Sequence, residues 1–414
     1  MGDVGSGRAP GIVIRVARRK ILRRTFFALL LAAEIAASPT GGGSIALAQT
    51  AFYSPVAINL SAYRPGALIR AEPMAGAPAA ANAWRILYRS TGLHGEPIAV
   101  SGVVIVPRGV TPPGGRSIIA WAHPTTGIVA QCAPSLARVF FRSVQGLQEM
   151  TERGYAVAAT DYPGLGTPEV HPYLVGDSEG KAVIDSVRAA HSVPGVGNNP
   201  SFAVWGHSQG GQAALFTGLL AANYAPELKL VGVAAAAPAT DLRTLMLSDL
   251  DTSGGRNITA MTLWSWSRVY GASIADVVTP QAVPVIDRLA NLCIERFFDA
   301  LIRRGPTQAL ARSFLRVRDF ADRQPWQTLL AQNTPAPLPA RIPVFLAQGT
   351  ADNLVSPSIT LAYRDKLCRQ GNAVALVMLP DTGHLFVARN AASAAIGWIA
   401  DRFNGVSPPS NCGR

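Results

Sequence analysis

Charged residues and cysteine are both scarce in this sequence. Only 15 % of its 414 residues are charged, whereas 49 % are hydrophobic, so the chain can bury a large core and intrinsic disorder is excluded. The four cysteines form no C-x-x-C pair and the six histidines show no metal-ligand spacing, so we expect no metal and no organic cofactor. The positive charge comes almost entirely from scattered arginines without interleaved aromatic residues, which argues against a nucleic-acid-binding protein.

Long apolar runs are also missing beyond the N-terminus, so we expect no transmembrane helix in the body of the chain. The N-terminus has seven cations, an apolar segment at residues 26–37 and an A-x-A site at residues 46–48, which predict a cleaved signal peptide over residues 1–48. Its R-R-T-F-F motif also resembles a twin-arginine signal, whereas Glu34 in the apolar segment leaves an uncleaved anchor as the alternative. We expect a secreted or periplasmic protein. Losing the seven cations and two carboxylates of the signal peptide lowers the formal charge from +12 to +7.

An exported protein with an even number of cysteines is expected to form disulfides. All four cysteines follow the predicted cleavage site, and their number alone allows three pairings among Cys132, Cys293, Cys368 and Cys412. The composition therefore predicts two disulfides but leaves their partners open.

The most informative stretch is residues 202–211, F-A-V-W-G-H-S-Q-G-G. An apolar run that predicts a buried strand ends in a G-x-S-x-G pattern, with Ser208 at the turn into a helix that opens with small residues. This arrangement is typical of a nucleophile elbow, in which glycines let the strand and the helix pass close to a strained serine. The N-terminus of the helix would add positive partial charge beside that serine. Ser208 is therefore the predicted nucleophile.

Buried strands alternate with helices on both sides of this elbow. Residues 84–89 and 98–106 predict antiparallel strands, whereas the later apolar runs predict parallel strands with residues 117–122 near the centre of the sheet. The expected parallel strands are residues 117–122, 155–160, the elbow strand, 228–236, 344–347 and 373–379, and the expected helices include 136–153, 179–191, 358–369 and 391–403. This pattern predicts an α/β fold with a mostly parallel, doubly wound sheet.

The alternation stops over residues 241–339. This stretch is helical and irregular, holds several tryptophans and phenylalanines, and ends in a proline-rich run. We interpret it as a helical cap inserted into a core of residues 49–240 and 340–414, with residues 49–83 wrapping around the core with little regular structure. For the arginines of the cap we expect a solvated helix face, with attraction to an anionic lipid interface as the alternative: Arg303, Arg304, Arg312, Arg316, Arg318 and Arg323.

A serine nucleophile needs a base, and the base needs a carboxylate that orients it. His384 is the one late histidine and follows the last predicted strand, so it is the predicted base. Asp352 follows the preceding strand and is preferred as the orienting carboxylate over Asp381, which lies three residues from the histidine. Asp161 comes before the serine, which is the wrong order, and is expected to hydrogen-bond within its own turn.

An oxyanion hole needs two backbone N–H donors. Gln209, directly after the serine, is the first predicted donor. The second should come from the loop after the first buried strand, where Pro124 has no N–H, so Thr125 is predicted and Thr126 is the alternative. The remaining histidines receive no role, and His207 is interpreted as the variable position of the elbow.

Six motifs, in their order along the chain, resemble the secretory lipase family, which includes fungal lipase A and exported bacterial relatives. They are W-A-H-P-T-T-G at 121–127, C-A-P-S at 132–135, D-Y-P-G-L-G at 161–166, G-H-S-Q-G-G at 206–211, Q-G-T-A-D at 348–352 and G-H at 383–384. The resemblance covers nearly all of the chain after the signal peptide. It implies an α/β-hydrolase core, a cap inserted before the strand that carries the acid, and ester hydrolysis through Ser208, Asp352 and His384.

The same resemblance implies a pairing of the cysteines. Cys132 would pair with Cys293 and tie the oxyanion loop to the cap, and Cys368 would pair with Cys412 and tie down the C-terminal tail. The chain departs from the family at Pro124, where such proteins commonly have glycine, and this departure bears on the second oxyanion donor.

The sequence therefore predicts an exported carboxylic ester hydrolase, a lipase or esterase that cleaves lipid or other apolar acyl esters through an acyl-enzyme. Its expected partners are the ester substrate and, transiently, a lipid interface. Because the catalytic residues alone do not choose between esters and amides, a serine peptidase or amidase on the same fold is the alternative. A non-catalytic binding protein is a more remote one.

Overall fold

The computed structural model describes residues 51–413 except 57, 249 and 295–296, and it describes no side chains for residues 297–304. The predicted signal peptide lies outside these residues. Among the described residues, no helix combines the length and the apolar character needed to span a membrane.

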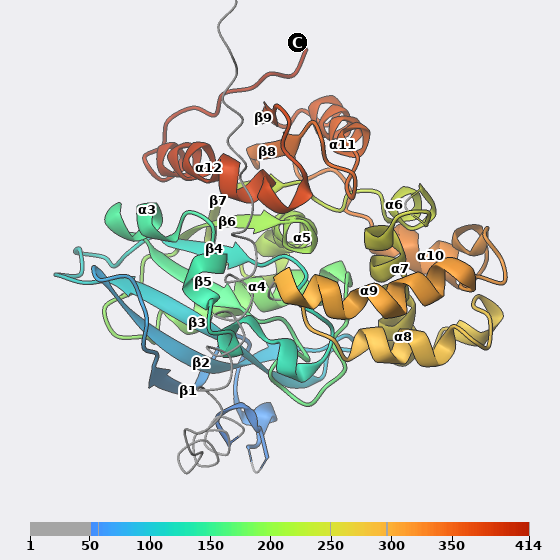
Figure 1. Ribbon diagram of the computed structural model, residues 1–414. Helices are drawn as coiled ribbons and strands as arrows, with labels where there is room; N and C mark the ends of the chain where they lie inside the picture. Colours follow the sequence, from blue (N-terminus) through green and yellow to red (C-terminus); the bar gives the residue numbers. More distant parts are fainter. Residues whose placement is uncertain (1–50, 57, 249, 295–296, 414) are drawn as a thin grey trace, which may run out of the picture. The chain divides into compact units, whose positions relative to one another are not determined.

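A nine-stranded sheet, in the order β1-β2-β3-β5-β4-β6-β7-β8-β9, organises the described chain (Figure 1). Three strands pair antiparallel at one side: β1 (Leu68–Pro73), β2 (Ala81–Thr91) and β3 (Pro97–Pro107), and β3 also pairs antiparallel with β5. The others run parallel: β4 (Ile118–Ala122), β5 (Ala156–Thr160), β6 (Ser201–His207), β7 (Lys229–Ala236), β8 (Val344–Gly349) and β9 (Val374–Leu379). The expected mostly parallel sheet is confirmed.

Strand β4 lies in the interior of the sheet, between β5 and β6. Every residue of β4 and β5 is buried, because both faces of the sheet are covered there, and this burial explains their continuous apolar sequences. Strands β4 to β9 are parallel, so their carboxyl ends meet at one edge of the sheet. The loops that leave this edge bring together residues that are far apart in the sequence.

Helices cover both faces of the sheet. On one face, α4 (Gly176–Ala190), α5 (Gln209–Tyr224) and α11 (Pro357–Arg369) share a core with the strands, and on the other face α3 (Leu147–Glu152) and α12 (Val387–Phe403) do so. The first group presents small residues such as Ala182 and Ala213, and the second buries Trp398 against Phe345 of β8. This two-sided covering is the doubly wound arrangement that the sequence predicts.

Two local expectations were wrong. The segment expected to have little regular structure, residues 49–83, contains strand β1, which pairs with β2 and extends the antiparallel side of the sheet. The single helix expected over residues 136–153 is broken into α2 (Phe140–Ser143) and α3. Gly146 lies at the break with a φ of 82°, a left-handed conformation that ends one helix and begins the next.

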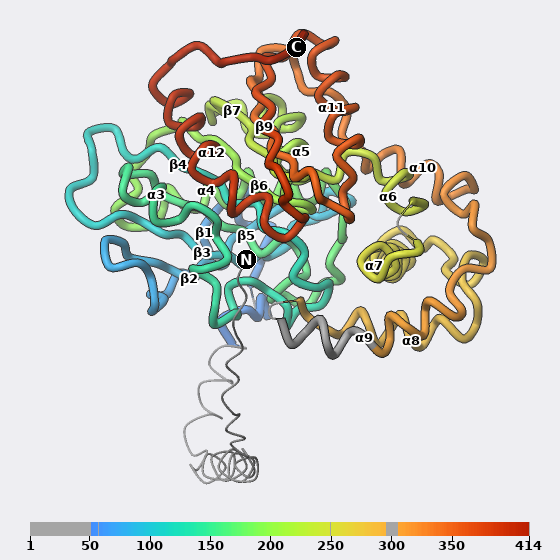
Figure 2. Tube along the Cα trace, turned by 45° about the horizontal axis from the view of Figure 1, so that its top comes forward, coloured from blue at the N-terminus to red at the C-terminus, as the bar shows by residue number. Residues whose placement is uncertain are grey.

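A group of helices is inserted between β7 and β8, and it stands together beside the sheet in both views (Figures 1 and 2). It comprises α6 (Leu242–Ser248), α7 (Ser253–Val269), α8 (Val283–Ala290), α9 (Phe297–Arg312) and α10 (Trp326–Gln332). Trp266 and Trp326 stack within it and Phe320 packs against Trp326, so these aromatic side chains form the core of the inserted helices. Among its arginines, Arg312, Arg316, Arg318 and Arg323 are exposed.

Two disulfides join segments that are distant in the sequence. Cys132 pairs with Cys293, and Cys368 pairs with Cys412, as the family resemblance implies. The first joins the segment after β4 to the inserted helical region. Next to it, the Ile294 N–H donates to the carbonyl oxygen of Thr126 over 2.8 Å, so two links hold this part of the inserted region against the loop after β4.

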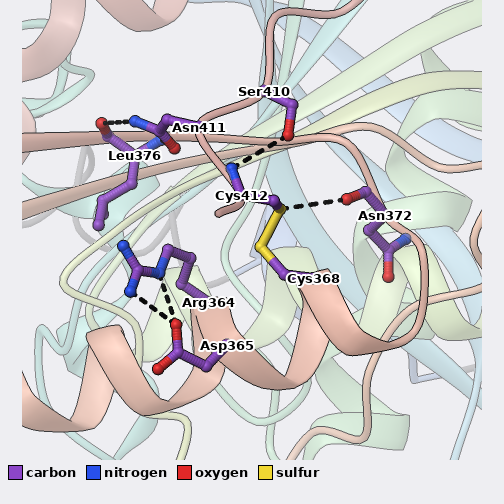
Figure 3. Close-up of a disulfide and its surroundings, with 8 residues drawn as sticks. All are labelled: Arg364, Asp365, Cys368, Asn372, Leu376, Ser410, Asn411 and Cys412. Atoms are coloured by element: carbon purple, nitrogen blue, oxygen red, sulfur yellow. Dashed lines mark hydrogen bonds and ion pairs between the residues drawn. A yellow bond between two sulfur atoms is a disulfide. The ribbon is translucent and has the colours of Figure 1, made fainter. Parts of the chain in front are cut away.

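The second disulfide fastens the C-terminal tail to α11 (Figure 3). Beside it, Asn411 forms hydrogen bonds with the backbone of Leu376 in β9, donating from Nδ2 over 2.8 Å and accepting at Oδ1 over 3.0 Å. The Asn411 N–H also donates to the carbonyl oxygen of Val374. The tail thus satisfies backbone groups that the edge strand would otherwise expose.

Candidate active site

Ser208 sits at the turn between β6 and α5, at the edge where the parallel strands end. Its φ of 58° is a strained left-handed conformation for a residue with a side chain, as expected of a nucleophile elbow. A Cβ on Gly206 would collide with the carbonyl oxygen of Gly210, and a Cβ on Gly210 would collide with that of Ala122. Both glycines are therefore required by close backbone approach, and the second brings the loop after β4 against the elbow.

A continuous chain of hydrogen bonds links the three side chains predicted to act together. His384, in the short helix η6 (His384–Phe386) after β9, lies with Nε2 2.9 Å from Ser208 Oγ. Its Nδ1 lies 2.8 Å from Oδ2 of Asp352, in the loop after β8. Because the carboxylate only accepts, Nδ1 carries the proton, and Nε2 is left to accept from the serine hydroxyl. The arrangement can take a proton from Ser208.

Asp352 is held by donors on both of its oxygens. Oδ1 accepts from the N–H groups of Leu354 and Val355, and Oδ2 accepts from Gln348 Nε2 as well as from the histidine. Burial by itself would raise the pKa of Asp352, but the hydrogen bond and the charge of His384, together with the two backbone donors, outweigh it and lower this pKa. The site therefore keeps Asp352 ionised as a permanent partner of the imidazole.

The competing carboxylate, Asp381, lies elsewhere. Its side chain is exposed, and its N–H donates to Thr350 Oγ1 over 2.9 Å. Among the described residues, Asp352 is the carboxylate hydrogen-bonded to His384. The geometry therefore favours the carboxylate that follows β8.

His207 has a contact that sequence reasoning missed. It is buried, and its Nε2 donates to the main-chain carbonyl of His384 over 3.0 Å, with the two rings 5.0 Å apart. Burial, with the neighbouring His384 adding to it, lowers the pKa of His207 to about 3, so it stays neutral. His207 is thus more than the variable position of the elbow, because it holds the loop that carries the predicted base. Its position next to the serine was the one available signal.

The predicted oxyanion donors are Gln209, which follows Ser208 in the chain, and Thr125, in the loop after β4. Gln209 is the first residue of α5, so its N–H is one that the helix cannot satisfy, and within the described part of the chain it has no acceptor. Thr125 is fixed through its side chain, whose Oγ1 lies 2.9 Å from Tyr173 Oη. Gln209 lines the pocket at the serine, whereas neither Thr125 nor Thr126 is part of its wall. The second donor therefore stays a prediction.

A small apolar pocket opens at Ser208. Apart from Ser208, Gln209 and Tyr173, its wall is made of aliphatic side chains, small residues and one methionine. They come from the segment before α4, the loop after β7, α6, α7 and the loop after β8: Leu174, Ala239, Leu242, Leu245, Met246, Gly255, Ile258, Leu354 and Val355. Such a wall suits a hydrocarbon chain attached to the carbon that the serine would attack.

Asp161 does not bond within its own turn, contrary to expectation. Its carboxylate accepts from Ser101 Oγ on β3 over 2.6 Å, from the Ser135 N–H over 2.8 Å and from the Ser135 hydroxyl. Burial raises the pKa of Asp161 to about 6, and these donors counteract part of that rise. Asp161 therefore joins the turn after β5 to its neighbours, a role that depends on residues distant in the sequence.

No group of three or more histidine, cysteine, aspartate or glutamate side chains that could hold a metal ion is found among the described residues. The candidate site consists of the Ser208–His384–Asp352 chain, the N-terminus of α5 and the apolar pocket. These features together can support nucleophilic attack on an acyl carbonyl.

Comparison with known proteins shows the family of the chain. The family model described as secretory lipase matches residues 144–411, which is more than half of the chain. Lipase 2 of Candida albicans is 27 % identical over 354 residues, covering 80 % of this chain and 74 % of that protein.

Two solved structures share the fold. The X-ray structure of Candida antarctica lipase A superposes with a TM-score of 0.74 at 18 % identity, covering 86 % of each chain. The rice cell wall degrading esterase LipA from Xanthomonas oryzae superposes with a TM-score of 0.67 at 21 % identity, covering 83 % of this chain and all of that one. With this α/β-hydrolase architecture and the match of the family model, the chain belongs to the secretory lipase family and is a carboxylic ester hydrolase.

Proposed function

We propose that this protein is an exported serine hydrolase that cleaves lipid or other apolar acyl esters with Ser208, His384 and Asp352. The observation that carries the proposal is the hydrogen-bond chain from Asp352 through His384 to Ser208, which ends in an apolar pocket. A polar, ionised relay with an apolar wall beside the nucleophile suits an acyl group whose carbonyl is reactive and whose chain is hydrophobic.

In the first half of the proposed reaction, Ser208 Oγ attacks the acyl carbonyl carbon and its proton passes to His384 Nε2. The carbonyl oxygen becomes an oxyanion, which the Gln209 and Thr125 N–H groups stabilise. When the tetrahedral intermediate collapses, the bond to the alkoxide breaks and His384 gives that oxygen the proton. Asp352 keeps the imidazole oriented and stabilises its positive charge throughout.

In the second half, a water molecule replaces the alcohol. His384 takes a proton from it, the hydroxide attacks the acyl-enzyme, and the same oxyanion donors act again. The bond between the acyl carbon and Ser208 Oγ breaks, and the proton returns from His384 to the serine. The acid leaves, and the enzyme regains its starting state with no added cofactor.

Contact with a lipid surface is part of the proposal. Directly after His384, the side chains of Leu385 and Phe386 are 79 % and 52 % exposed, so apolar surface lies next to the proposed base. Exposed arginines of the inserted region, Arg312 at the end of α9 and Arg316 and Arg318 after it, add positive charge that would attract an anionic interface. Export is supported by the N-terminal signal pattern and by two disulfides, which persist in oxidising compartments.

The test is hydrolysis of p-nitrophenyl esters from short to long acyl chains, below and above the concentration at which each substrate aggregates. Ser208→Ala is the control, and the expected result is Ser208-dependent hydrolysis that favours long chains and rises at the interface. Activity confined to short soluble esters would mean that the protein is a general esterase and not a lipase. Matched amides that are cleaved faster than the esters would point to the amidase alternative, and no Ser208-dependent turnover of either would overturn the proposal.

A further inference from the structure

A buried carboxyl is hydrogen-bonded to the side chain of Gln209, one of the proposed oxyanion donors. Glu179, in the first turn of α4, is completely buried. Its Oε1 accepts from Gln209 Nε2 over 2.7 Å and from the Leu174 N–H over 3.0 Å. Gln209 is the residue whose backbone N–H is proposed to bind the oxyanion, so Glu179 holds the side chain of an oxyanion donor.

The second hydrogen of the Gln209 amide also has an acceptor. His171 Nδ1 lies 2.7 Å from the carbonyl oxygen of Pro163, which only accepts, so Nδ1 carries the hydrogen of this neutral ring. Its Nε2 is therefore free to accept, and it lies 3.2 Å from Gln209 Nε2. The Gln209 amide nitrogen is thus held between two buried acceptors, Glu179 and His171.

The segment between these two acceptors also reaches the other predicted donor. Tyr173 Oη contacts Thr125 Oγ1 over 2.9 Å, and Tyr173 and Leu174 both line the pocket. The inserted helix α7 holds this segment through Ser265 Oγ, which accepts from the Tyr173 N–H, and through Trp266 Nε1, which donates to the Tyr173 carbonyl. One buried network therefore supports both sides of the predicted oxyanion hole.

We propose that Glu179 is a positioning residue for this oxyanion hole, and that it works in its uncharged form by holding the Gln209 side chain so that the Gln209 N–H keeps its direction. This inference rests on the proposed function, because it assigns support to a donor of the proposed mechanism. Glu179 lies behind the donor and acts through it, so its effect is on transition-state stabilisation more than on substrate binding.

No positively charged group is among the causes that shift the pKa of Glu179, so its charge would be stabilised only by its two hydrogen bonds. Its Oε2 is buried and has no hydrogen-bond partner within the described residues. Helix α5 presents the uncharged Gln209 to Glu179. Among the described residues, Tyr162, after β5, interacts electrostatically with Glu179, and His171 shares the Gln209 amide with it. Burial raises the pKa of Tyr162 well above its usual value and lowers the pKa of His171 to about 3, so both are neutral near pH 7.

On its own helix, the charges nearest to Glu179 in sequence satisfy each other, because Lys181 pairs with Asp177 over 2.6 Å. Burial raises the pKa of Glu179 to about 8, although the hydrogen bonds from Gln209 and Leu174 lower it in part. Above this pH a negative charge would lie behind the place where the oxyanion develops. We therefore expect kcat to fall as Glu179 loses its proton.

The experiment compares Glu179→Gln with Glu179→Met on a short soluble p-nitrophenyl ester, from about pH 6 to about pH 10. Glutamine keeps the accepting oxygen but cannot ionise, so kcat should stay within about twofold of the wild type near pH 6.5 and the decline near pH 8 should disappear. Methionine has a similar size but no acceptor, so kcat should fall about tenfold with KM nearly unchanged, and a tetrahedral boronic acid should bind correspondingly more weakly.

Asp185→Asn is the matched control, because Asp185 is a buried carboxyl on the same helix that bonds to Ser90 and Arg188, away from the elbow. It should lower thermal stability and leave the pH profile unchanged. An alkaline decline in Glu179→Gln identical to that of the wild type would overturn the proposal, and this result decides it even if Glu179→Met does not fold. If Ser208→Ala is inactive while the Glu179→Gln profile is unchanged, only this inference fails. If Ser208→Ala remains active, the proposed function fails.

Discussion

The two groups of residues predicted to act with Ser208 are built in different ways. Asp352 and His384 come from successive strand ends and form a short relay of side chains with a permanent charge. The predicted oxyanion donors belong to the main chain, and buried side chains from α4, the segment before it and α7 support them. Each side chain of the relay takes part in the proton transfer itself, so replacing one of them should nearly abolish kcat. Several side chains together position the oxyanion donors, so replacing one of them should lower kcat only in part.

The largest effect is expected on the relay. In Asp352→Asn the imidazole loses the carboxylate that fixes its tautomer, so kcat should fall about 10⁴-fold while the fold is retained. Steady-state kinetics with the short p-nitrophenyl ester would measure it, with circular dichroism to check folding. Asp381→Asn is the matched control and should be nearly neutral, because Asp381 is exposed. If the control had the larger effect, Asp381 would be the orienting carboxylate.

The next largest effect is expected for the main-chain N–H of Thr125, a predicted oxyanion donor. Thr125→Pro removes a backbone N–H, so kcat should fall about 100-fold with little change in KM. Thr125→Val keeps the N–H and loses only the contact with Tyr173, so its loss should be a few-fold at most. A Thr126→Pro variant that loses more activity than Thr125→Pro would assign the donor to Thr126.

His207 provides a graded effect on the relay side. Phenylalanine keeps the size of the ring but cannot donate to the His384 carbonyl, a loss of about 1 kcal/mol, so kcat should fall about fivefold. KM should not change, because His207 does not line the pocket. A drop as large as that of Asp352→Asn would mean that the loop after β9 depends on this one hydrogen bond.

The two disulfides differ in their distance from the predicted oxyanion loop, and smaller effects on activity are expected from removing them. Replacing Cys132 and Cys293 by alanine releases the loop next to the predicted oxyanion donor, so kcat should fall about twofold to threefold and stability by about 2–4 kcal/mol. Replacing Cys368 and Cys412 frees only the tail, so stability should fall while kcat is kept. Thermal unfolding would rank the stability of the two double variants, and steady-state kinetics would then compare their kcat. An equal loss of kcat in both would show that the first disulfide has no special link to the site.

The smallest expected effect is on stability alone. Burial raises the pKa of Glu179 to about 8, so folding favours its protonated form. This contribution is complete below about pH 4.5 and is lost as the pH rises through about 8. The melting temperature of the wild type should therefore fall relative to that of Glu179→Gln between about pH 5 and about pH 9, by about 5 °C. A constant difference across this range would show that Glu179 has the same charge folded and unfolded.

The sequence predicts the relay far better than its support. Ser208, Asp352 and His384 each follow a strand with a readable apolar pattern, and a parallel sheet places such residues at one edge, where the structure brings them within hydrogen-bonding distance. Glu179, His171 and His207 have no comparable local pattern. Their contacts reach residues 30 to 177 positions away, and such contacts appear only when the chain is folded.

Local errors have the same cause. Strand β1 lacks an apolar run, because it is partly exposed beside β2, and so its sequence does not differ from that of a loop. The break at Gly146 divides residues with helical spacing, and it is set by contact with Ile396 of α12 as well as by the glycine itself. A contact with a distant part of the chain, strand pairing in one case and side-chain packing in the other, decided both.

The Cys132–Cys293 disulfide, with 161 residues of separation, closes a covalent ring of the main chain. Ser208 lies inside this ring, whereas Asp352 and His384 lie outside it. A protease that cuts any exposed turn within the ring therefore releases no fragment, and the two pieces stay joined unless a reductant is present. In an oxidising environment that contains other secreted enzymes, a single cut would leave the nucleophile tethered to the strand ends that carry its partners.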